Sequence, residues 1–116
     1  MEEESESRQD EPFGLWELDA SGAVLHYEPE AGESSTFRPP EVVGTNFFGG
    51  VIPAGQAREF EAHFKGFVSG PAPAHGFAFI MRFGQHSLRT RVLMGRVHER
   101  LAPGSAESIL VHIRRA

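Results

Sequence analysis

Residues 41–70, EVVGTNFFGGVIPAGQAREFEAHFKGFVSG, decide the fold of this chain. The first part predicts a short helix that closes on Gly44, because glycine commonly follows the last turn of a helix. The aromatic pair Phe47-Phe48 and a glycine-rich turn through Pro53 and Ala54 come next, and an amphipathic helix completes the stretch. A helix, a loop over a cavity and a second helix are typical of a small-molecule sensor domain that encloses its ligand.

The second helix of this stretch is predicted from Gln56 to the end at Ser69-Gly70. Its aromatic residues Phe60, Phe64 and Phe67 recur at spacings of three and four, which places them on one face of a helix. An aromatic stripe at this spacing predicts core packing and not a cofactor site.

Extended segments flank this central stretch. Residues 13–28 alternate around the turn 19–22 and predict a hairpin. Residues 29–40 are rich in Pro, Gly, Ser and Glu and predict irregular structure, and Pro39-Pro40 then opens the first helix. Residues 74–83, 87–98 and 108–115 predict an antiparallel meander. We therefore expect an α+β fold, a five-stranded antiparallel sheet with short helices on one face.

Composition limits the classes of function. The chain has 116 residues, a net charge of −5 and no cysteine, which excludes disulfides, thiolate metal sites and a cysteine nucleophile. Residues 1–12 hold the acidic excess and are expected to form a disordered tail before one domain at 13–116. The near-neutral domain argues against nucleic acid, and the lack of a long apolar run or basic leader argues against a membrane and for the cytoplasm.

The motif Asn46-Phe47-Phe48, followed by Glu59-Phe60 and Phe64-Lys65, resembles the PAS domain of the photoactive yellow protein family. Matching residues extend from the hairpin to the fourth strand and are Gly14, Leu18, Asp19, Gly22, Leu25, Tyr27, Gly32, Val43, Gly44, Val51, Pro53, Gly66, Val68, Ser69, Gly70, Val92 and Met94.

The resemblance implies a pocket that has lost its pigment chemistry. The family attaches a hydroxycinnamoyl chromophore to a cysteine after the loop proline, and this chain has Ala54 there. The family's pocket glutamate, threonine, arginine and tyrosine fall at Ala31, Ser35, Phe37 and Phe83. The vestigial pocket is expected to comprise Tyr27, Ala31, Ser35, Phe37, Ala54, Phe79, Met81 and Phe83, without a cofactor.

What remains is a ligand-free signalling or scaffolding module that associates with a protein partner or with itself. Alternation places a mixed apolar and charged set on the outer face of the sheet, a composition that suits an interface. This set is Leu15, Glu17, Val24, His26, Ile80, Arg82, Arg89, Arg91, Leu93, Leu110 and His112.

Two other classes of function stay open. A non-covalent ligand or haem sensor would use His63, which lies on the helix but one position away from the stripe of Phe60 and Phe64. No two histidines have metal-site spacing on one element, which disfavours zinc. An enzyme is not expected, because there is no nucleophile elbow, phosphate-binding loop or carboxylate pair at a predicted cleft.

Overall fold

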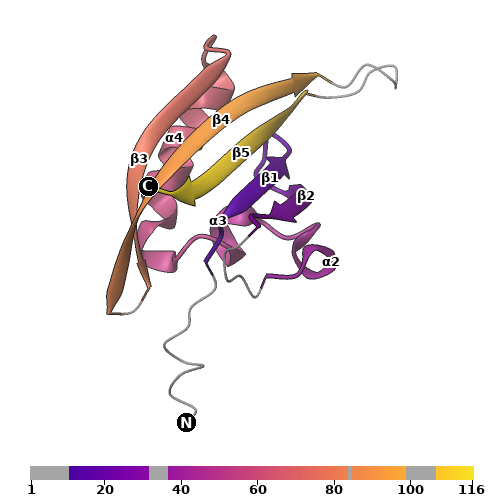
Figure 1. Cartoon of the computed structure of the whole chain (residues 1–116). Helices are drawn as coiled ribbons and strands as arrows, with labels where there is room; N and C mark the ends of the chain where they lie inside the picture. The colour runs from indigo at the N-terminus through magenta and orange to yellow at the C-terminus, as the bar shows by residue number, and fades with distance from the viewer. Residues whose placement is uncertain (1–10, 32–36, 84, 99–106) are drawn as a thin grey trace.

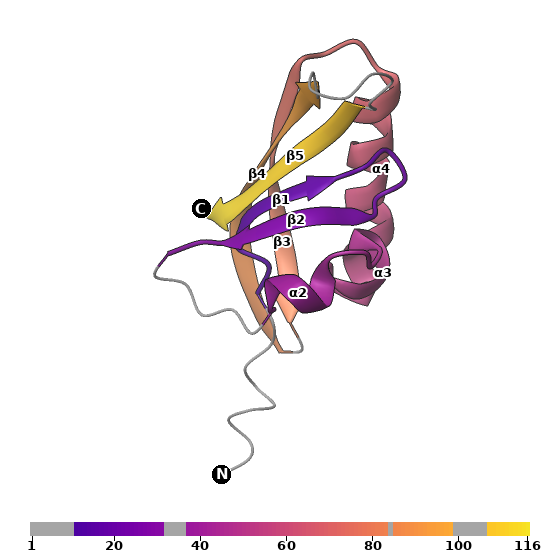
Figure 2. The ribbon, with the colours of Figure 1, turned by 90° about the vertical axis from the view of Figure 1, so that its right-hand side faces the viewer.

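A five-stranded antiparallel sheet forms the centre of the molecule, with the helices on one of its faces (Figures 1 and 2). The computed structural model describes residues 11–31, 37–83, 85–98 and 107–116. The strands are β1 (Gly14–Leu18), β2 (Val24–Pro29), β3 (Ala74–Phe83), β4 (His86–His98) and β5 (Glu107–Arg115), in the spatial order β2-β1-β5-β4-β3. The predicted α+β architecture, hairpin and meander are confirmed.

The helical segments are α2 (Pro39–Val42), α3 (Phe47–Gly50), the 3₁₀ turn η1 (Ala54–Gln56) and α4 (Ala57–Ser69). As predicted, α2 begins with two prolines, and Gly44 follows it with a φ of +91°. Helix α4 buries its three phenylalanines against the sheet, which confirms the predicted stripe.

The glycine-rich segment after Asn46 is helical, whereas the sequence predicted only a turn. The Asn46 side chain accepts hydrogen bonds from the backbone N–H groups of Phe48 (2.9 Å) and Gly49 (3.1 Å). This N-cap satisfies donors that the first turn of a helix leaves unpaired, and it stabilises α3 despite the two glycines.

A β-bulge in the first hairpin corrects one predicted position. The register between β1 and β2 shifts between Glu17 and Leu18, so that both Val24 and Tyr27 point into the core. Val24 is only 1% exposed, and its assignment to the outer face is therefore wrong. Strict alternation fails here because the bulge adds one residue to β2.

The packed part of the chain begins two residues earlier than the expected boundary. The Trp16 indole N–H donates to the Pro12 carbonyl (3.0 Å), and the Glu11 carboxylate pairs with Arg115 (3.4 Å). Residues 1–10, the remainder of the expected acidic tail, lie outside the described residues. Within the described ranges, no helix is both long and apolar enough to span a membrane.

Candidate functional site

Aromatic rings fill the space between the inner face of the sheet and the helices. Trp16 of β1 stacks on Tyr27 of β2, with ring centroids 3.7 Å apart. The edges of Phe47 and Phe37 meet Trp16 at centroid distances of 5.0 and 5.9 Å. Offset and edge-to-face contacts of this kind stabilise an aromatic core beyond simple burial.

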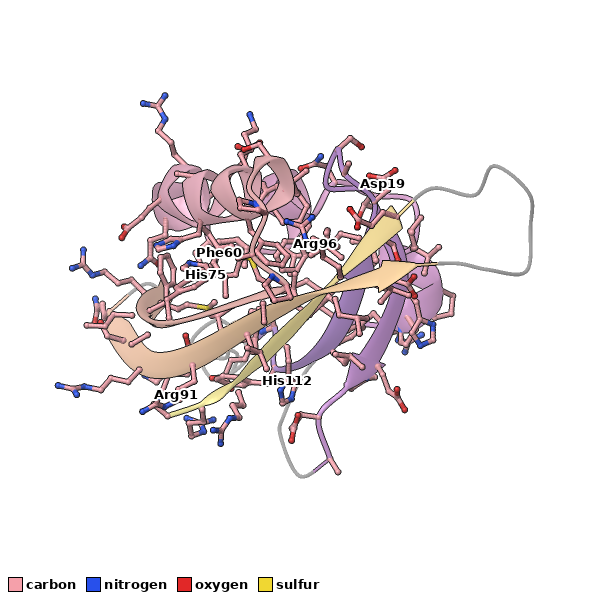
Figure 3. All side chains as sticks on the ribbon, turned by 90° about the horizontal axis from the view of Figure 1, so that it is seen from above. Asp19, Phe60, His75, Arg91, Arg96 and His112 are labelled. Carbon is pink, nitrogen blue, oxygen red and sulfur yellow. The ribbon has the colours of Figure 1, made fainter. Side chains whose placement is uncertain are left out.

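Phe60 of α4 lies at the centre of this cluster and has no exposed surface. Its ring centroid is 5.7 Å from that of Phe47, 5.6 Å from Phe77 and 5.2 Å from Phe79. Figure 3 shows Phe60 between α4 and the sheet. The side chains that would wall a ligand chamber are therefore in contact with one another.

The structure gathers only part of the expected vestigial pocket. Tyr27, Phe79 and Met81 are buried in this core, and Phe37 packs against it. Ala31 and Ala54, by contrast, are exposed at the surface. Ser35 and the side chain of Phe83 lie outside the described residues.

The polar groups in the interior are already paired. The Thr90 hydroxyl donates to the Phe79 carbonyl (2.8 Å), and the Tyr27 hydroxyl donates to the Phe13 carbonyl (3.1 Å). Among the described residues, every buried side-chain nitrogen and oxygen has a hydrogen-bond partner. Since unpaired buried polar groups are costly, this part of the interior has no donor or acceptor waiting for a ligand.

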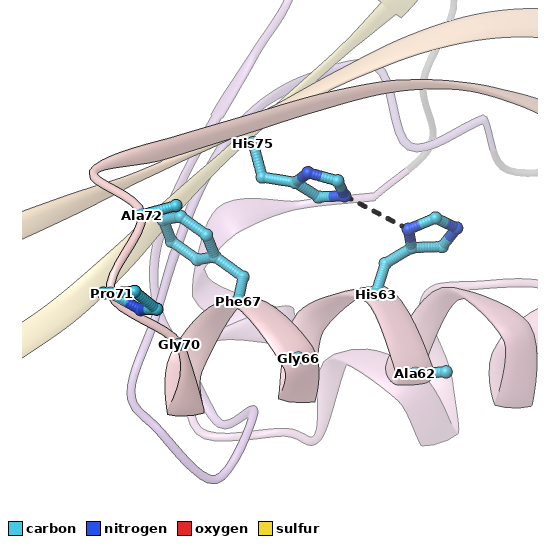
Figure 4. Close-up of a pocket in the computed structure, with 8 residues that line it drawn as sticks. All are labelled: Ala62, His63, Gly66, Phe67, Gly70, Pro71, Ala72 and His75. Carbon is cyan, nitrogen blue, oxygen red and sulfur yellow. Dashed lines mark hydrogen bonds between the residues drawn. The ribbon is translucent and has the colours of Figure 1, made fainter.

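His63, the expected haem ligand, lies at the edge of the core and not within it. Its ring lies flat on Phe77, with a centroid distance of 3.8 Å and an interplanar angle of 5°. His63 Nδ1 is 3.3 Å from Nε2 of His75 on β3 (Figure 4). Sequence reasoning missed this histidine pair because its members lie on different elements, twelve residues apart.

The outer face of the sheet carries an open apolar hollow of about 440 Å³. Leu15 pairs across the strands with His112, and His112 in turn pairs with Leu93. Leu93 is 53% exposed and Ile80 is 50% exposed. The hollow is lined by Leu15, Ala74, Leu93, Met94, Gly95, Leu110 and His112. Figure 3 places Arg91 and His112 on the side of the sheet away from α4.

Charges of opposite sign divide the outer face of the sheet by strand. The acidic side chains belong to β1, β2 and the residue after β2, and they are Glu17, Glu28 and Glu30. The basic side chains belong to β3, β4 and β5, and they are Arg82, Arg89, Arg91 and Arg114. Within this set Arg91 lies directly opposite Arg114, a like-charge pairing that is unfavourable on an isolated sheet.

Several predicted outer residues contact one another or their neighbours. His112 Nε2 lies 3.2 Å from the Glu30 carboxylate, and the Ser108 hydroxyl donates to Glu17 (2.6 Å). His26 is exposed opposite Glu17, and the bulge exposes Leu25 beside it. The sequence analysis missed Leu25, Glu28, Glu30 and Arg114, and the first of these could not be assigned without knowledge of the bulge.

Arg96 is a further residue that the sequence analysis did not single out. Its guanidinium donates to the carbonyls of Ala72 (2.9 Å), Phe67 (2.6 Å) and Gly70 (2.6 Å), and it pairs with Glu107 (3.2 Å). It also lies 4.4 Å from the centroid of the Phe67 ring. The sequence did hold a signal for this residue. Arg96 continues the alternation of Val92 and Met94, which places it on the inner face of β4, and a charge on that face requires partners.

No family model matches the chain. The photoactive yellow protein of Halochromatium salexigens is 37% identical over 83 residues, which cover 71% of this chain and 66% of that protein. The photoactive yellow protein of Rhodothalassium salexigens is 31% identical over 85 residues, which cover 72% of this chain and 67% of that protein. The chain thus matches about two thirds of the length of these relatives.

Solved structures show the same architecture. The photoactive yellow protein domain of the sensor histidine kinase Ppr from Rhodospirillum centenum aligns with a TM-score of 0.66 and 26% identity, over 90% of this chain and 86% of that one. The PAS domain of BvgS from Bordetella pertussis has a TM-score of 0.61 at 13% identity, over 90% and 77% of the two chains, and supports the fold alone. This chain belongs to the photoactive yellow protein family and has the PAS fold, in a sequence without cysteine.

Proposed function

We propose that this chain is a non-photoactive PAS signalling or scaffolding module that acts by association through its outer sheet face, with a second copy of itself as the partner. The observation that carries the proposal is the open apolar hollow on that face, in a sheet with acidic residues on the β1 and β2 side and basic residues on β3, β4 and β5.

The inner side of the sheet lacks the chemistry for covalent pigment attachment. A thioester needs a cysteine, and the chain has none. Ala54, at the position that the family resemblance assigns to the attachment, is exposed on η1. The aromatic cluster around Phe60 occupies the space beneath the helices. Light detection by a bound hydroxycinnamoyl group is therefore not the function that we propose, and neither is catalysis.

Burial of the outer sheet face in an interface would supply free energy of association. Leu93 and Ile80 each keep about half of their surface exposed on one sheet face. Covering such apolar side chains contributes roughly 25 cal/mol per Å² removed from water. Desolvated residues at the centre of an interface carry most of its binding energy, and arginine is enriched among them.

Charge complementarity selects a second copy as the occupant. β5 is the middle strand of the order β2-β1-β5-β4-β3. A two-fold axis that runs along β5 between two facing sheets places β1 and β2 of each copy over β3 and β4 of the other. Glu28 and Glu30 then face the arginine-bearing side, including Arg91, in an isologous interface. The acidic residues of the other copy then offset the unfavourable proximity of Arg91 to Arg114 on the β4 side.

The test is the double variant Arg91→Glu with Leu93→Asp, measured by sedimentation equilibrium and light scattering at several concentrations. We expect a wild-type dimer and a folded monomeric variant. The matched control is Arg58→Glu with Val43→Asp, because Val43 is 47% exposed on the helical side and Arg58 is exposed on α4. A wild-type monomer, or equal association of both variants, would reject the second-copy interface.

The alternative of a non-covalent ligand or haem sensor has less support. His63 Nδ1 contacts His75, and the His63 ring is covered on one side by Phe77. The interior near Phe60 is occupied by side chains. Addition of haemin should therefore give no Soret shift that depends on His63, and a shift lost in His63→Ala would favour the sensor instead.

A further inference from the structure

His63 and His75 form a pair that neither the family resemblance nor the association model explains. His63 belongs to α4, and His75 is the second residue of strand β3. Both side chains are partly buried, and their facing nitrogens, Nδ1 of His63 and Nε2 of His75, are 3.3 Å apart. Figure 4 shows the two rings between α4 and β3, with a dashed line joining their facing nitrogens.

Phe77 holds the pair in place. The His63 ring stacks on it at 3.8 Å and 5°, and the His75 ring is tilted against it at 5.2 Å and 31°. A ring fixed by packing loses less conformational freedom when its nitrogen binds a ligand, which is the requirement for a preorganised site.

The separation of the two nitrogens fits a shared metal ion. Imidazole nitrogens bind Zn²⁺ at about 2.0–2.1 Å, and two of them at a tetrahedral angle are therefore about 3.3–3.4 Å apart. The observed 3.3 Å is in this range. The ring centroids are 5.5 Å apart and the ring planes are inclined by 26°. Because the two nitrogens now face each other in a hydrogen bond, each imidazole must rotate before both lone pairs point at one ion.

The surroundings leave room for such an ion. The adjoining groove measures about 350 Å³, and small residues form most of its lining: Ala62, Gly66, Gly70, Pro71 and Ala72. No group of three or more His, Cys, Asp or Glu side chains gathers at one point within the described part of the chain. Water molecules would therefore complete the coordination, and the bound ion would exchange readily.

We propose that His63 and His75 form a two-histidine site for a divalent transition metal ion of the class that prefers imidazole, Zn²⁺, Ni²⁺ or Cu²⁺. Among these, Cu²⁺ binds most tightly by the general order of divalent affinities. The ion links the middle of α4 to the edge strand β3, because one ligand comes from each element. Both nitrogens must carry free lone pairs, so binding breaks the hydrogen bond between them, and each neutral ring keeps its proton on the nitrogen opposite the ion.

The test uses untagged full-length protein dialysed against a chelator, titrated with NiCl₂, ZnCl₂ or CuSO₄ by calorimetry and followed by thermal unfolding. We expect one ion per chain. At ten times its Kd, the ion should raise the Tm by about 5 °C, because it binds the folded state only. His75→Gln and His63→Gln should each weaken binding at least tenfold, whereas His26→Gln, an exposed histidine on the outer sheet face, should leave it unchanged.

Two results would overturn the site. One is no heat and no Tm shift in the wild type up to millimolar metal. The other is metal binding of wild-type affinity in both His63→Gln and His75→Gln, which would place the ion at another site. Should either variant fail to fold, the wild-type protein still decides: substoichiometric Cu²⁺ must broaden the imidazole NMR signals of His63 and His75 before those of His26.

Discussion

The two faces of the sheet differ in how completely they are covered. The inner face packs against α3 and α4 through Trp16, Phe47 and Phe60, none of which has exposed surface. The outer face leaves Leu93 and Ile80 about half exposed, with charges of both signs around them. The inner face thus supplies the folding free energy, whereas the outer face retains apolar surface that association can cover.

In a PAS fold without an attachment residue, this difference favours a function at the outer face of the sheet. The helices remain in place although the ring cluster fills the volume beneath them. Aromatic packing of this kind stabilises the helical cover of a PAS fold that has no attachment residue.

The largest expected effect comes from Phe60→Ala on the inner face. Truncation of a fully buried phenylalanine costs about 3–5 kcal/mol of unfolding free energy, a large part of the total for a small domain. Urea denaturation measures it. The matched control is Leu25→Ala, which is 45% exposed and should change stability by no more than about 0.5 kcal/mol. Equal losses would erase the distinction between the faces.

Arg96→Ala should give the next largest effect, at the border of the inner face. Its side chain is 14% exposed and holds the carbonyls of Phe67, Gly70 and Ala72. Loss of these charge-assisted bonds should cost about 2–3 kcal/mol. Arg96→Lys should recover only part of it, because one ammonium cannot replace the planar fork. A loss below about 0.5 kcal/mol in thermal unfolding would contradict the role of Arg96.

The Asp19 carboxylate stabilises the turn that joins β1 to β2. The Ser21 hydroxyl, with further N–H donors from Ala23, Ser21 and Gly22, lowers the pKa of Asp19 despite partial desolvation. The stabilisation is therefore present above the ordinary aspartate pKa and is lost as the pH falls through the lowered folded value. Asp19→Asn should cost less than about 1 kcal/mol at pH 7, because solvent screens the site, and less still near pH 2. A pH-independent difference in urea denaturation would reject this account.

Restoring the thiol should have the smallest effect. Ala54→Cys, treated with an activated hydroxycinnamoyl ester, should label at the surface but keep the absorption of a solvated ester, because the inner rings leave the pigment outside. The control is the labelled variant in denaturant, whose spectrum should be nearly the same. A strong red shift confined to the folded state would show that the inner face still accepts the pigment.

The sequence predicted the fold well because its signals are local. Alternation in residues 74–83, the spacing of Phe60 and Phe64, and the two prolines that begin α2 each determine an element without long-range information. Position on a face was harder to predict. Val24 was assigned to the wrong face because a bulge is a property of the strand pair. The two glycines predicted a turn after Phe48, but the N-cap hydrogen bonds of Asn46 stabilise a helix there.

The candidate sites depend on contacts between distant residues, which explains what the sequence analysis missed. His63 meets His75 only when α4 packs beside β3, and Arg96 meets the end of α4 across 26 residues. The charge division of the outer face likewise appears only once the strand order is known, because Glu30 and Arg91 are far apart in sequence.

A charge-swap experiment tests the central claim, association of two copies through the outer face. One variant carries Arg91→Glu and Arg114→Glu, and the other carries Glu28→Arg and Glu30→Arg, both checked for folding by circular dichroism. Each alone should be monomeric in sedimentation equilibrium, because like charges then face each other. Their equimolar mixture should form a 1:1 heterodimer. A mixture that stays monomeric while the wild type dimerises would contradict the two-fold, charge-paired interface.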